Sequence, residues 1–163
     1  MNSLNFAQRI RLLALLMMRR YLLMAGMSLI PFSFIRVLVI RICGITIGKG
    51  CYVGFHVAFD TNFPELITIG DNVSISHNVA IYTHTITPVK SRLANVYDSK
   101  AAVIIHDGAW LSAGSMIVPG VEIGADCMIG AGSVVTRSTE PGSLYAGNPA
   151  RLIKRIVFKD GLP

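Results

Sequence analysis

The chain has 163 residues, of which 52% are apolar and 15% charged, and its formal net charge is +6. This length suits one domain, and the abundance of apolar residues excludes a disordered chain. The three cysteines, Cys43, Cys51 and Cys127, have no C-x-x-C spacing, which argues against a disulfide framework and against a thiolate zinc site. We therefore expect a protein of a reducing compartment, the cytoplasm.

The positive charge is concentrated at the two ends of the chain. Residues 1–49 contain seven Arg or Lys side chains and no acidic one, and a second basic group near the C-terminus consists of Arg151, Lys154, Arg155 and Lys159. Neither group is accompanied by aromatic stacking residues or a nucleic-acid-binding motif, so we expect no nucleic-acid partner. An anionic membrane surface at the N-terminus and a phosphorylated small ligand at the C-terminus explain the pattern better.

Residues 1–43 are predicted to form an apolar, basic helical segment. Its uncharged runs are interrupted at Arg19, Arg20 and Arg36, and each is shorter than the roughly 20 residues that a spanning helix needs. A signal peptide is not expected either, because no small-residue cleavage site follows the apolar run. The segment is therefore predicted to pack on the body of the protein or to contact the inner face of a membrane.

From residue 67 onward, aliphatic side chains recur at every sixth position. The repeat comprises Ile69, Ile75, Ile81, Ile105, Leu111, Ile117, Ile123, Ile129 and Val135. A period of six predicts a short strand followed by a tight turn, with three such units in one triangular coil and coils stacked about 4.8 Å apart. Gly and Asn are expected at the corners, where a positive φ is needed. An antiparallel sandwich would instead show a period of two.

Two stretches interrupt this period. An insertion between residues 55 and 66 shifts its phase, and the polar segment 85–100, which carries Pro88, lacks the glycine punctuation. The second stretch is predicted to be a loop that protrudes from the solenoid. Loops of this length within a compact repeat are usually functional.

Residues 44–156, and most specifically GAWLSAGSMIVPGVEIGADCMIGAGSVVTRSTEPGSLYAGNPARLIKRI at 108–156, resemble the hexapeptide-repeat acyltransferases. The similarity is greatest to the galactoside and maltose O-acetyltransferase branch and to its relatives that acetylate bacterial surface polysaccharides. The resemblance implies an all-β fold, a left-handed parallel β-helix, which is a known exception to right-handed crossovers. This β-helix domain at 44–156 would follow the helical segment 1–43 and precede a tail at 157–163.

The resemblance also implies a homotrimer with active sites between subunits and acetyl-CoA as the acyl donor. The coenzyme contacts of the family fall on Trp110, Ala113, Ala131, Thr136, Arg151 and Lys154. The small alanines would allow the pantetheine arm to approach the backbone, and the two cations suit the phosphates of the nucleotide. Alternatively, Ala131 is an ordinary turn residue, Trp110 serves packing, and the two cations form a solvated surface.

Acetyl transfer to a hydroxyl needs a general base, for which histidine is suited near neutral pH. His84 ends the strand-like segment VAIYTH at the mouth of the loop and is our candidate, whereas His77 and His106 occupy repeat turns. In the related family the base aligns with Ile86, two positions later. Either His84 has taken over this role by a two-residue slip, or another group acts, or activity is lost. The resemblance places the donor to the oxyanion at a backbone amide near Ala113.

The acceptor-binding Asn and Asp of the related family align with His56 and Pro64, and Asp60 lies nearby. We take His56 and Asp60 as candidate substrate contacts. Because Pro64 cannot reproduce the hydrogen bonds of Asp, a galactoside or maltose acceptor is disfavoured. A sugar hydroxyl of a bacterial surface glycan or its precursor, near the membrane, is expected instead.

Two other functions remain open. The same solenoid occurs in γ-type carbonic anhydrases, which bind zinc through three histidines, but His106 has no second histidine about five residues later. No metal is therefore expected. A catalytically silent scaffold is the other alternative, and the absence of histidine at position 86 keeps it open.

Overall fold

The computed structural model describes residues 5–88, 90, 92–93, 96 and 100–158. Two helices, α1 (Phe6–Leu29) and α2 (Ser33–Ile42), precede a series of short strands. The strands of the first two coils are β1 (Thr46–Ile47), β2 (Tyr52–Val53), β3 (Ala58–Phe59), β4 (Ile67–Ile69), β5 (Ser74–Ile75) and β6 (Ala80–Ile81), with a 3₁₀ helix, η1 (Pro64–Leu66), before β4. The later strands are β7 (Val103–Ile105), β8 (Trp110–Leu111), β9 (Met116–Ile117), β10 (Glu122–Ile123), β11 (Met128–Ile129), β12 (Val134–Val135), β13 (Ser143–Gly147) and β14 (Ala150–Arg155).

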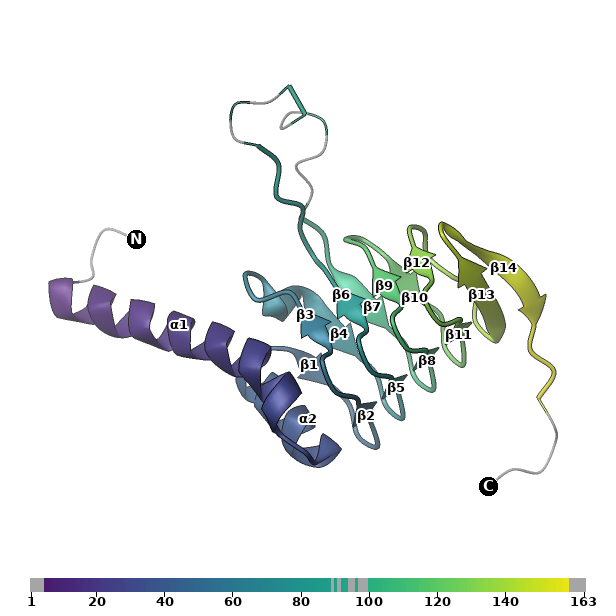
Figure 1. Ribbon diagram of the computed structural model, residues 1–163, viewed down its shortest axis with the longest axis horizontal. Helices are drawn as coiled ribbons and strands as arrows, with labels where there is room; N and C mark the ends of the chain where they lie inside the picture. Colours follow the sequence, from purple (N-terminus) through teal and green to yellow (C-terminus); the bar gives the residue numbers. More distant parts are fainter. Residues whose placement is uncertain (1–4, 89, 91, 94–95, 97–99, 159–163) are drawn as a thin grey trace.

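The strands form three sheets, and every third strand from β1 to β12 joins the same sheet (Figure 1). Sheet A has the order β1-β4-β7-β10, sheet B has β14-β13-β11-β8-β5-β2 and sheet C has β12-β9-β6-β3. The pairs are parallel except for β13 and β14. Strands that follow one another around three sheets in turn fit the β-helix that the six-residue period predicts.

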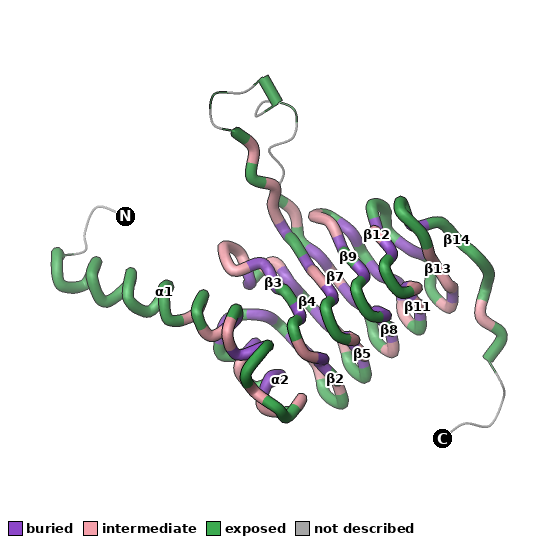
Figure 2. Tube along the Cα trace, viewed as in Figure 1, coloured by how far each residue is buried: buried purple, intermediate pink, exposed green. Residues whose placement is uncertain are grey.

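All nine aliphatic residues of the six-residue repeat are buried. The residues two positions before them are buried as well, namely Ile67, Val73, Val79, Val103, Ala109, Ser115, Val121, Cys127 and Ser133. Parallel register stacks identical positions of successive coils, so that Ile47, Ile69, Ile105 and Ile123 form one column inside sheet A. In Figure 2 buried, intermediate and exposed residues alternate along the coils.

The corners carry the residues that the repeat predicts. Gly114 and Gly132 lie one above the other at the corner between sheets B and C, with φ of 70° and 67°, and the Gly132 amide donates to Ala113 O at 2.9 Å. Asn72 and Asn78 have φ of 57° and 59°, a conformation that Asn tolerates better than most side chains. The turn chemistry expected from the sequence is therefore confirmed at these positions.

The N-terminal segment forms one long helix and one short helix. α1 continues through Arg19 and Arg20, because a helix tolerates charged side chains wherever they reach solvent. It begins with a capping box between Asn5 and Gln8, and it ends at Leu29, shortly before Pro31. α2 packs against the first coil, beside β1 and β2. The division between domains at residues 43 and 44 stays a prediction.

Candidate functional site

Both interruptions of the repeat lie at the corner where sheet C leads to sheet A. Between Phe59 of β3 and Ile69 of β4 the chain advances ten positions instead of six, and between Ile81 of β6 and Ile105 of β7 it advances 24. β7 nevertheless pairs directly with β4, so the intervening chain leaves the solenoid. The described residues of this loop extend outward from the coils in Figure 1. The predicted loop is thus seen, and it emerges beside the earlier insertion.

Asp60 and His84 meet at this corner. Asp60 directly follows β3 and is only 2% exposed, and its Oδ2 accepts a hydrogen bond from His84 Nδ1. The same oxygen accepts from the Thr83 amide at 3.0 Å and from Thr83 Oγ1 at 2.8 Å. The other carboxylate oxygen, Oδ1, accepts from the backbone amides of Asn62 at 2.9 Å and Phe63 at 3.2 Å. The carboxylate is therefore fully engaged and fixes one edge of the imidazole ring.

These donors keep Asp60 ionised. Burial alone raises its pKa, but the hydrogen bonds from His84, from Thr83 and from the backbone outweigh that effect and lower the pKa from 3.8 to about 2. A carboxylate that accepts from Nδ1 places the proton of neutral imidazole on that nitrogen and leaves the lone pair on Nε2. His84 is consequently arranged as a proton acceptor through Nε2.

The other side of His84 is formed by residues of both insertions. Its Nε2 lies 3.0 Å from Asn62 Nδ2, and the Phe63 ring meets the imidazole edge-on at 5.2 Å between ring centroids. Lys100, which forms an antiparallel bridge with His84, holds its Nζ 3.5 Å above the Phe63 ring centroid. The sequence analysis missed Asn62, Phe63 and Lys100, because only the folded corner brings them to the histidine.

A hollow of about 380 Å³ opens beside this cluster. It is lined by Phe59, Asp60, Thr61, Asn62, Tyr82, His84 and Ile86. Ile86, the position at which the related family has its base, is 84% exposed. His84 is instead held by Asp60 at the wall of the hollow. A hydroxyl bound here would lie near a base already positioned by a carboxylate.

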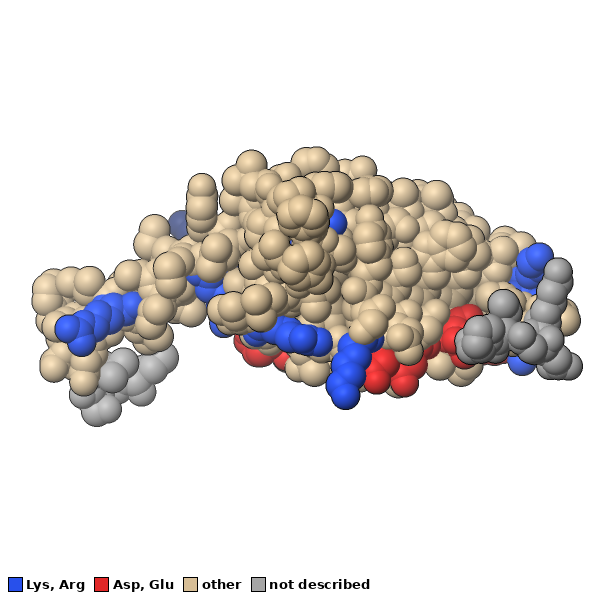
Figure 3. All heavy atoms as spheres, turned by 90° about the horizontal axis from the view of Figure 1, so that it is seen from below, with Lys and Arg blue, Asp and Glu red and all other residues tan. Residues whose placement is uncertain are grey.

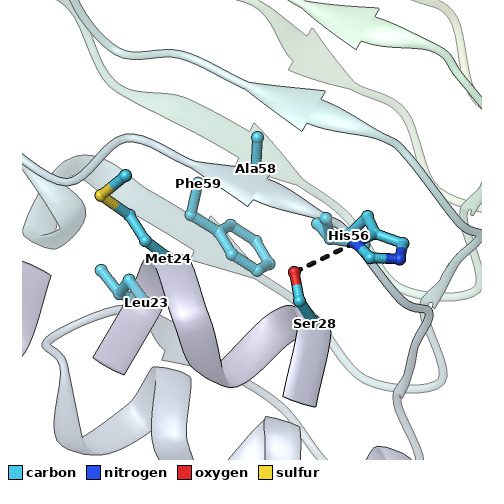
Figure 4. Close-up of a pocket in the computed structure, with 7 residues that line it drawn as sticks. Leu23, Met24, Ser28, His56, Ala58 and Phe59 are labelled. Carbon is cyan, nitrogen blue, oxygen red and sulfur yellow. Dashed lines mark hydrogen bonds between the residues drawn. The ribbon is translucent and has the colours of Figure 1, made fainter. Parts of the chain in front are cut away.

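His56 occupies a different hollow, shown in Figure 4. Its Nδ1 lies 3.0 Å from Ser28 Oγ of α1, and its backbone amide donates to Met27 O at 2.9 Å. This hollow of about 240 Å³ is also lined by Leu23, Met24 and other residues between α1 and β3. The structure therefore brings Asp60, but not His56, to His84. Asp60 is hydrogen-bonded to the histidine and only 2% exposed, which fits a positioning role better than direct substrate contact.

The residues expected to contact acetyl-CoA are exposed, and most of them follow one edge of the solenoid. Trp110 lies on β8, where its Nε1 donates to Ser76 Oγ at 3.2 Å, and Ala113 and Ala131 occupy the same corner in two successive coils. Within the described part of the chain, the amides of both alanines have no hydrogen-bond partner. Thr136 instead follows β12 at the corner of His84.

Arg151 and Lys154 lie on β14, the outer strand of sheet B, and both are exposed. Arg151 Nη1 donates to its neighbouring carbonyl, Ala150 O, at 3.0 Å. Lys159, the last member of this basic group in the sequence, lies outside the described residues. Among the residues that are described, no group of three or more His, Cys, Asp or Glu side chains could hold a metal ion.

Comparison with known proteins links this geometry to a family. Residues 102–137 match the family model described as bacterial transferase hexapeptide (six repeats). The chain is 35% identical over 117 residues to galactoside O-acetyltransferase of Escherichia coli K12, a match that covers 71% of this chain and 56% of that enzyme. Two other curated relatives are covered over 60% and 55% of their length, so the chain spans little more than half of such proteins.

Solved structures show the same architecture. A hexapeptide-repeat acetyltransferase of Vibrio cholerae in complex with acetyl coenzyme A superposes with a TM-score of 0.73 at 23% identity, covering 91% of this chain and 90% of that one. A galactoside acetyltransferase in complex with coenzyme A has a TM-score of 0.63 at 26% identity, covering 97% and 98%. The resemblance to hexapeptide-repeat acyltransferases is confirmed.

Proposed function

We propose that this chain, a relative of the hexapeptide-repeat acyltransferases, is an O-acetyltransferase that moves an acetyl group from acetyl-CoA to a sugar hydroxyl. The observation that carries the proposal is the Asp60–His84 pair at the wall of an open hollow. Curated relatives named galactoside O-acetyltransferase, and a related structure with coenzyme A bound, support the reaction class. In the proposed arrangement the coils wind left-handed, as the resemblance implies.

His84 acts as the general base. As the sugar hydroxyl attacks the thioester carbonyl carbon, Nε2 takes the hydroxyl proton and a carbon–oxygen bond forms. The resulting oxyanion collapses, the carbon–sulfur bond breaks, and the imidazolium returns the proton to the departing thiolate of coenzyme A. Asp60 stabilises the imidazolium between these steps, because it stays ionised and its hydrogen bond to Nδ1 persists.

The contacts of His84 favour the two-residue slip over the loss of a base. Side chains two residues apart on a strand share a face, so His84 and Ile86 can serve the same hollow, and both line it. Asn62 Nδ2 occupies the position beside Nε2 from which a hydroxyl would donate its proton. The acceptor sugar must therefore displace this amide, whose oxygen can then accept a hydrogen bond from a neighbouring hydroxyl.

The exposed edge between sheets B and C supports acetyl-CoA as the donor. The unpaired amides of Ala113 and Ala131 suit the carbonyl groups of a pantetheine arm, and the absence of larger side chains there allows a close approach. One of these amides, at or near Ala113, would stabilise the oxyanion. Arg151 and Lys154 on β14 would face the phosphates of the nucleotide.

The placement of these groups supports a homotrimer with sites shared between subunits. His84 lies at the corner between sheets C and A, whereas Trp110, Ala113 and Ala131 lie along the opposite edge of sheet C. A thioester held along one edge would not reach the base on the other edge of the same chain. Each complete site would then pair the base of one subunit with the coenzyme edge of its neighbour, as the resemblance implies.

The acceptor is proposed to be a bacterial surface glycan or its precursor. The two positions aligned with acceptor-binding residues of the related family do not face the His84 hollow, because His56 contacts α1 and Pro64 is buried in η1. The hollow is open, and the exposed Ile86 lines it. These features fit one sugar unit of a longer chain better than a small soluble galactoside or maltose.

The proposal is tested by acetyl-CoA turnover in the His84→Ala variant. Release of the coenzyme A thiol is followed with a chromogenic disulfide over a panel of mono- and oligosaccharides, and the ester product is identified by its cleavage with hydroxylamine. We expect turnover to fall about 10²- to 10⁴-fold in H84A. The matched control is His106→Ala, since His106 is an exposed histidine that pairs with Glu122 at 2.5 Å, on another side of the solenoid. An H84A variant with wild-type turnover would exclude His84 as the base.

A further inference from the structure

α1 extends beyond the solenoid over most of its length. Of its 24 residues only Leu23, Gly26 and Met27, near its C-terminal end, are buried. Figure 1 shows the rest of the helix projecting from the first coil, and Figure 2 shows its surface exposed up to the point where it meets the body. Residues 6–18, the N-terminal half of α1, are all exposed.

One face of α1 is a continuous apolar stripe. At 100° per residue, the stripe residues fall within about 80° of arc. They are Phe6, Ile10, Leu13, Met17, Tyr21 and Met24, with exposed fractions from 50% to 79%. α2 adds a second exposed row, Phe34, Leu38 and Ile42, with four-residue spacing. Such an extended apolar surface is unusual for a protein that faces only water.

The charges beside the stripe are all positive. Arg11 and Arg20 are exposed and lie on opposite flanks of the stripe, about 80° beyond Tyr21 and about 20° beyond Leu13 respectively. The first acidic residue of the whole sequence is Asp60. The end of the molecule formed by α1 accordingly shows basic but no acidic atoms on the face seen in Figure 3. Arginine side chains in this position can reach outward while their aliphatic parts stay against an apolar phase.

α1 is long and apolar enough to cross a membrane by length and composition alone, and 17% of its most apolar window is buried in the protein. Its packing argues against a crossing, because the C-terminal turn is fixed to the solenoid and leaves at most residues 6–22 to enter the hydrocarbon core. These residues span about 26 Å, less than the roughly 30 Å hydrocarbon core, and they include four arginines.

We propose that α1 lies along the surface of an anionic lipid bilayer, with the stripe in the acyl region and the flanking arginines at the headgroups. The apolar stripe supplies the burial and the one-sided positive charge selects anionic lipid. A second copy of this chain is the less favoured occupant, because its α1 would bring further arginines to the same surface and neither helix carries an acidic side chain.

The test is vesicle flotation of the full chain. We compare vesicles of phosphatidylcholine with vesicles that also contain about one third phosphatidylglycerol. The wild-type protein should float with the anionic vesicles, and the fraction bound should fall when the ionic strength is raised from about 0.1 to 0.5 M. Leu13→Gln/Met17→Gln, which interrupts the stripe, should weaken binding tenfold or more.

The matched control is Leu12→Gln/Leu16→Gln, which makes a similar change on the other face of the same helix and should bind within about threefold of the wild type. Arg11→Gln/Arg20→Gln should lose the preference for anionic lipid. Circular dichroism should be unchanged in all three variants, since the replaced side chains are exposed.

Three outcomes would overturn the proposal. These are a wild-type protein that stays with the soluble fraction, equal binding to neutral and anionic vesicles, or equal loss in both leucine variants. A protein that does not float, and whose oligomeric mass falls in L13Q/M17Q alone, would assign the stripe to a second copy instead. None of these outcomes depends on acetyl-CoA turnover.

Discussion

Among the described residues, Asp60 is the only acidic one whose side chain is buried. Its two oxygens accept five hydrogen bonds, and these hold its pKa near 2. Since the folded pKa lies below the unfolded value of 3.8, ionised Asp60 stabilises the folded state above pH 3.8, and this stabilisation is lost as the pH falls through about 2. The contribution is about 2 kcal/mol at neutral pH.

The Asp60→Asn variant should therefore change the acid stability of the protein. We expect the free energy of unfolding to be lower by about 2 kcal/mol at pH 7, and the difference from the wild type to shrink as the pH falls from 4 towards 2. Urea unfolding at a series of pH values measures this. Glu122→Gln, which changes an exposed carboxylate paired with a histidine, is the control and should have little effect. If the free energies of unfolding of the wild type and D60N differed by the same amount at every pH, the low pKa of Asp60 would be contradicted.

At the level of single residues, the sequence predicts His84 and points to Asp60 but does not join them. They are 24 positions apart, and no periodicity relates them, because Asp60 lies in the first insertion and His84 lies at the start of the second. Asn62 and Phe63 belong to no motif and to no repeat position. They lie in the first insertion, where the chain uses four extra residues to cross the corner. Only the fold reveals that Asp60 faces the histidine.

Among the elements, the strands of the solenoid could be predicted because one aliphatic column dictates them. The period of six fixes both which residues point inward and where the turns lie, from Ile69 to Val135. The length of α1 could not be predicted in the same way. Charged residues such as Arg19 and Arg20 divide the apolar runs, yet a largely exposed helix accommodates them, and the chain turns only near Pro31.

Arg36 secures the two helices on the first coil. Its side chain is buried, with Nε donating to Val53 O at 2.9 Å, Nη1 donating to Ile30 O and the guanidinium 4.3 Å from the Phe55 ring centroid. Arg36→Leu would leave both carbonyls without donors, so we expect the free energy of unfolding to fall by about 3 kcal/mol in chemical denaturation.

The control for this variant is Arg20→Leu, which removes an exposed arginine from α1. It should stay within about 0.5 kcal/mol of the wild type. If R36L were as stable as R20L, the guanidinium would not be what anchors α2 to β2.

For the whole molecule, the separation of the proposed base and the proposed coenzyme edge predicts complementation between inactive subunits. His84→Ala would remove the proposed base, and Ala113→Trp should block the opposite edge of sheet C. Each variant alone should be nearly inactive. In oligomers assembled from equal amounts of both, about one interface in four would pair an intact base with an intact edge, and about a quarter of wild-type turnover should return.

This experiment separates the oligomeric arrangement from the reaction itself. If the mixture stays inactive while the wild type turns over acetyl-CoA, each site lies within one chain. Light scattering after size-exclusion chromatography provides the companion measurement, with a mass near three times 17.7 kDa expected. A wild type without turnover would instead contradict the proposed enzyme function.

The two ends of the stacked coils differ from the middle in a way that restricts how copies can associate. At the N-terminal end α2 covers the first strands of sheets A and B, and at the C-terminal end the antiparallel β14 closes sheet B. At the last strand of sheet A, the backbone amides of Glu122 and Gly124 donate to Ser138 Oγ and Thr139 Oγ1. The Thr139 amide donates in turn to Glu122 O. Open strand edges would template end-to-end fibre growth. Because α2 covers β1 and β2, and Ser138 and Thr139 bond to the last strand of sheet A, such growth is disfavoured at these edges, which leaves the flat faces of the solenoid for sideways contacts.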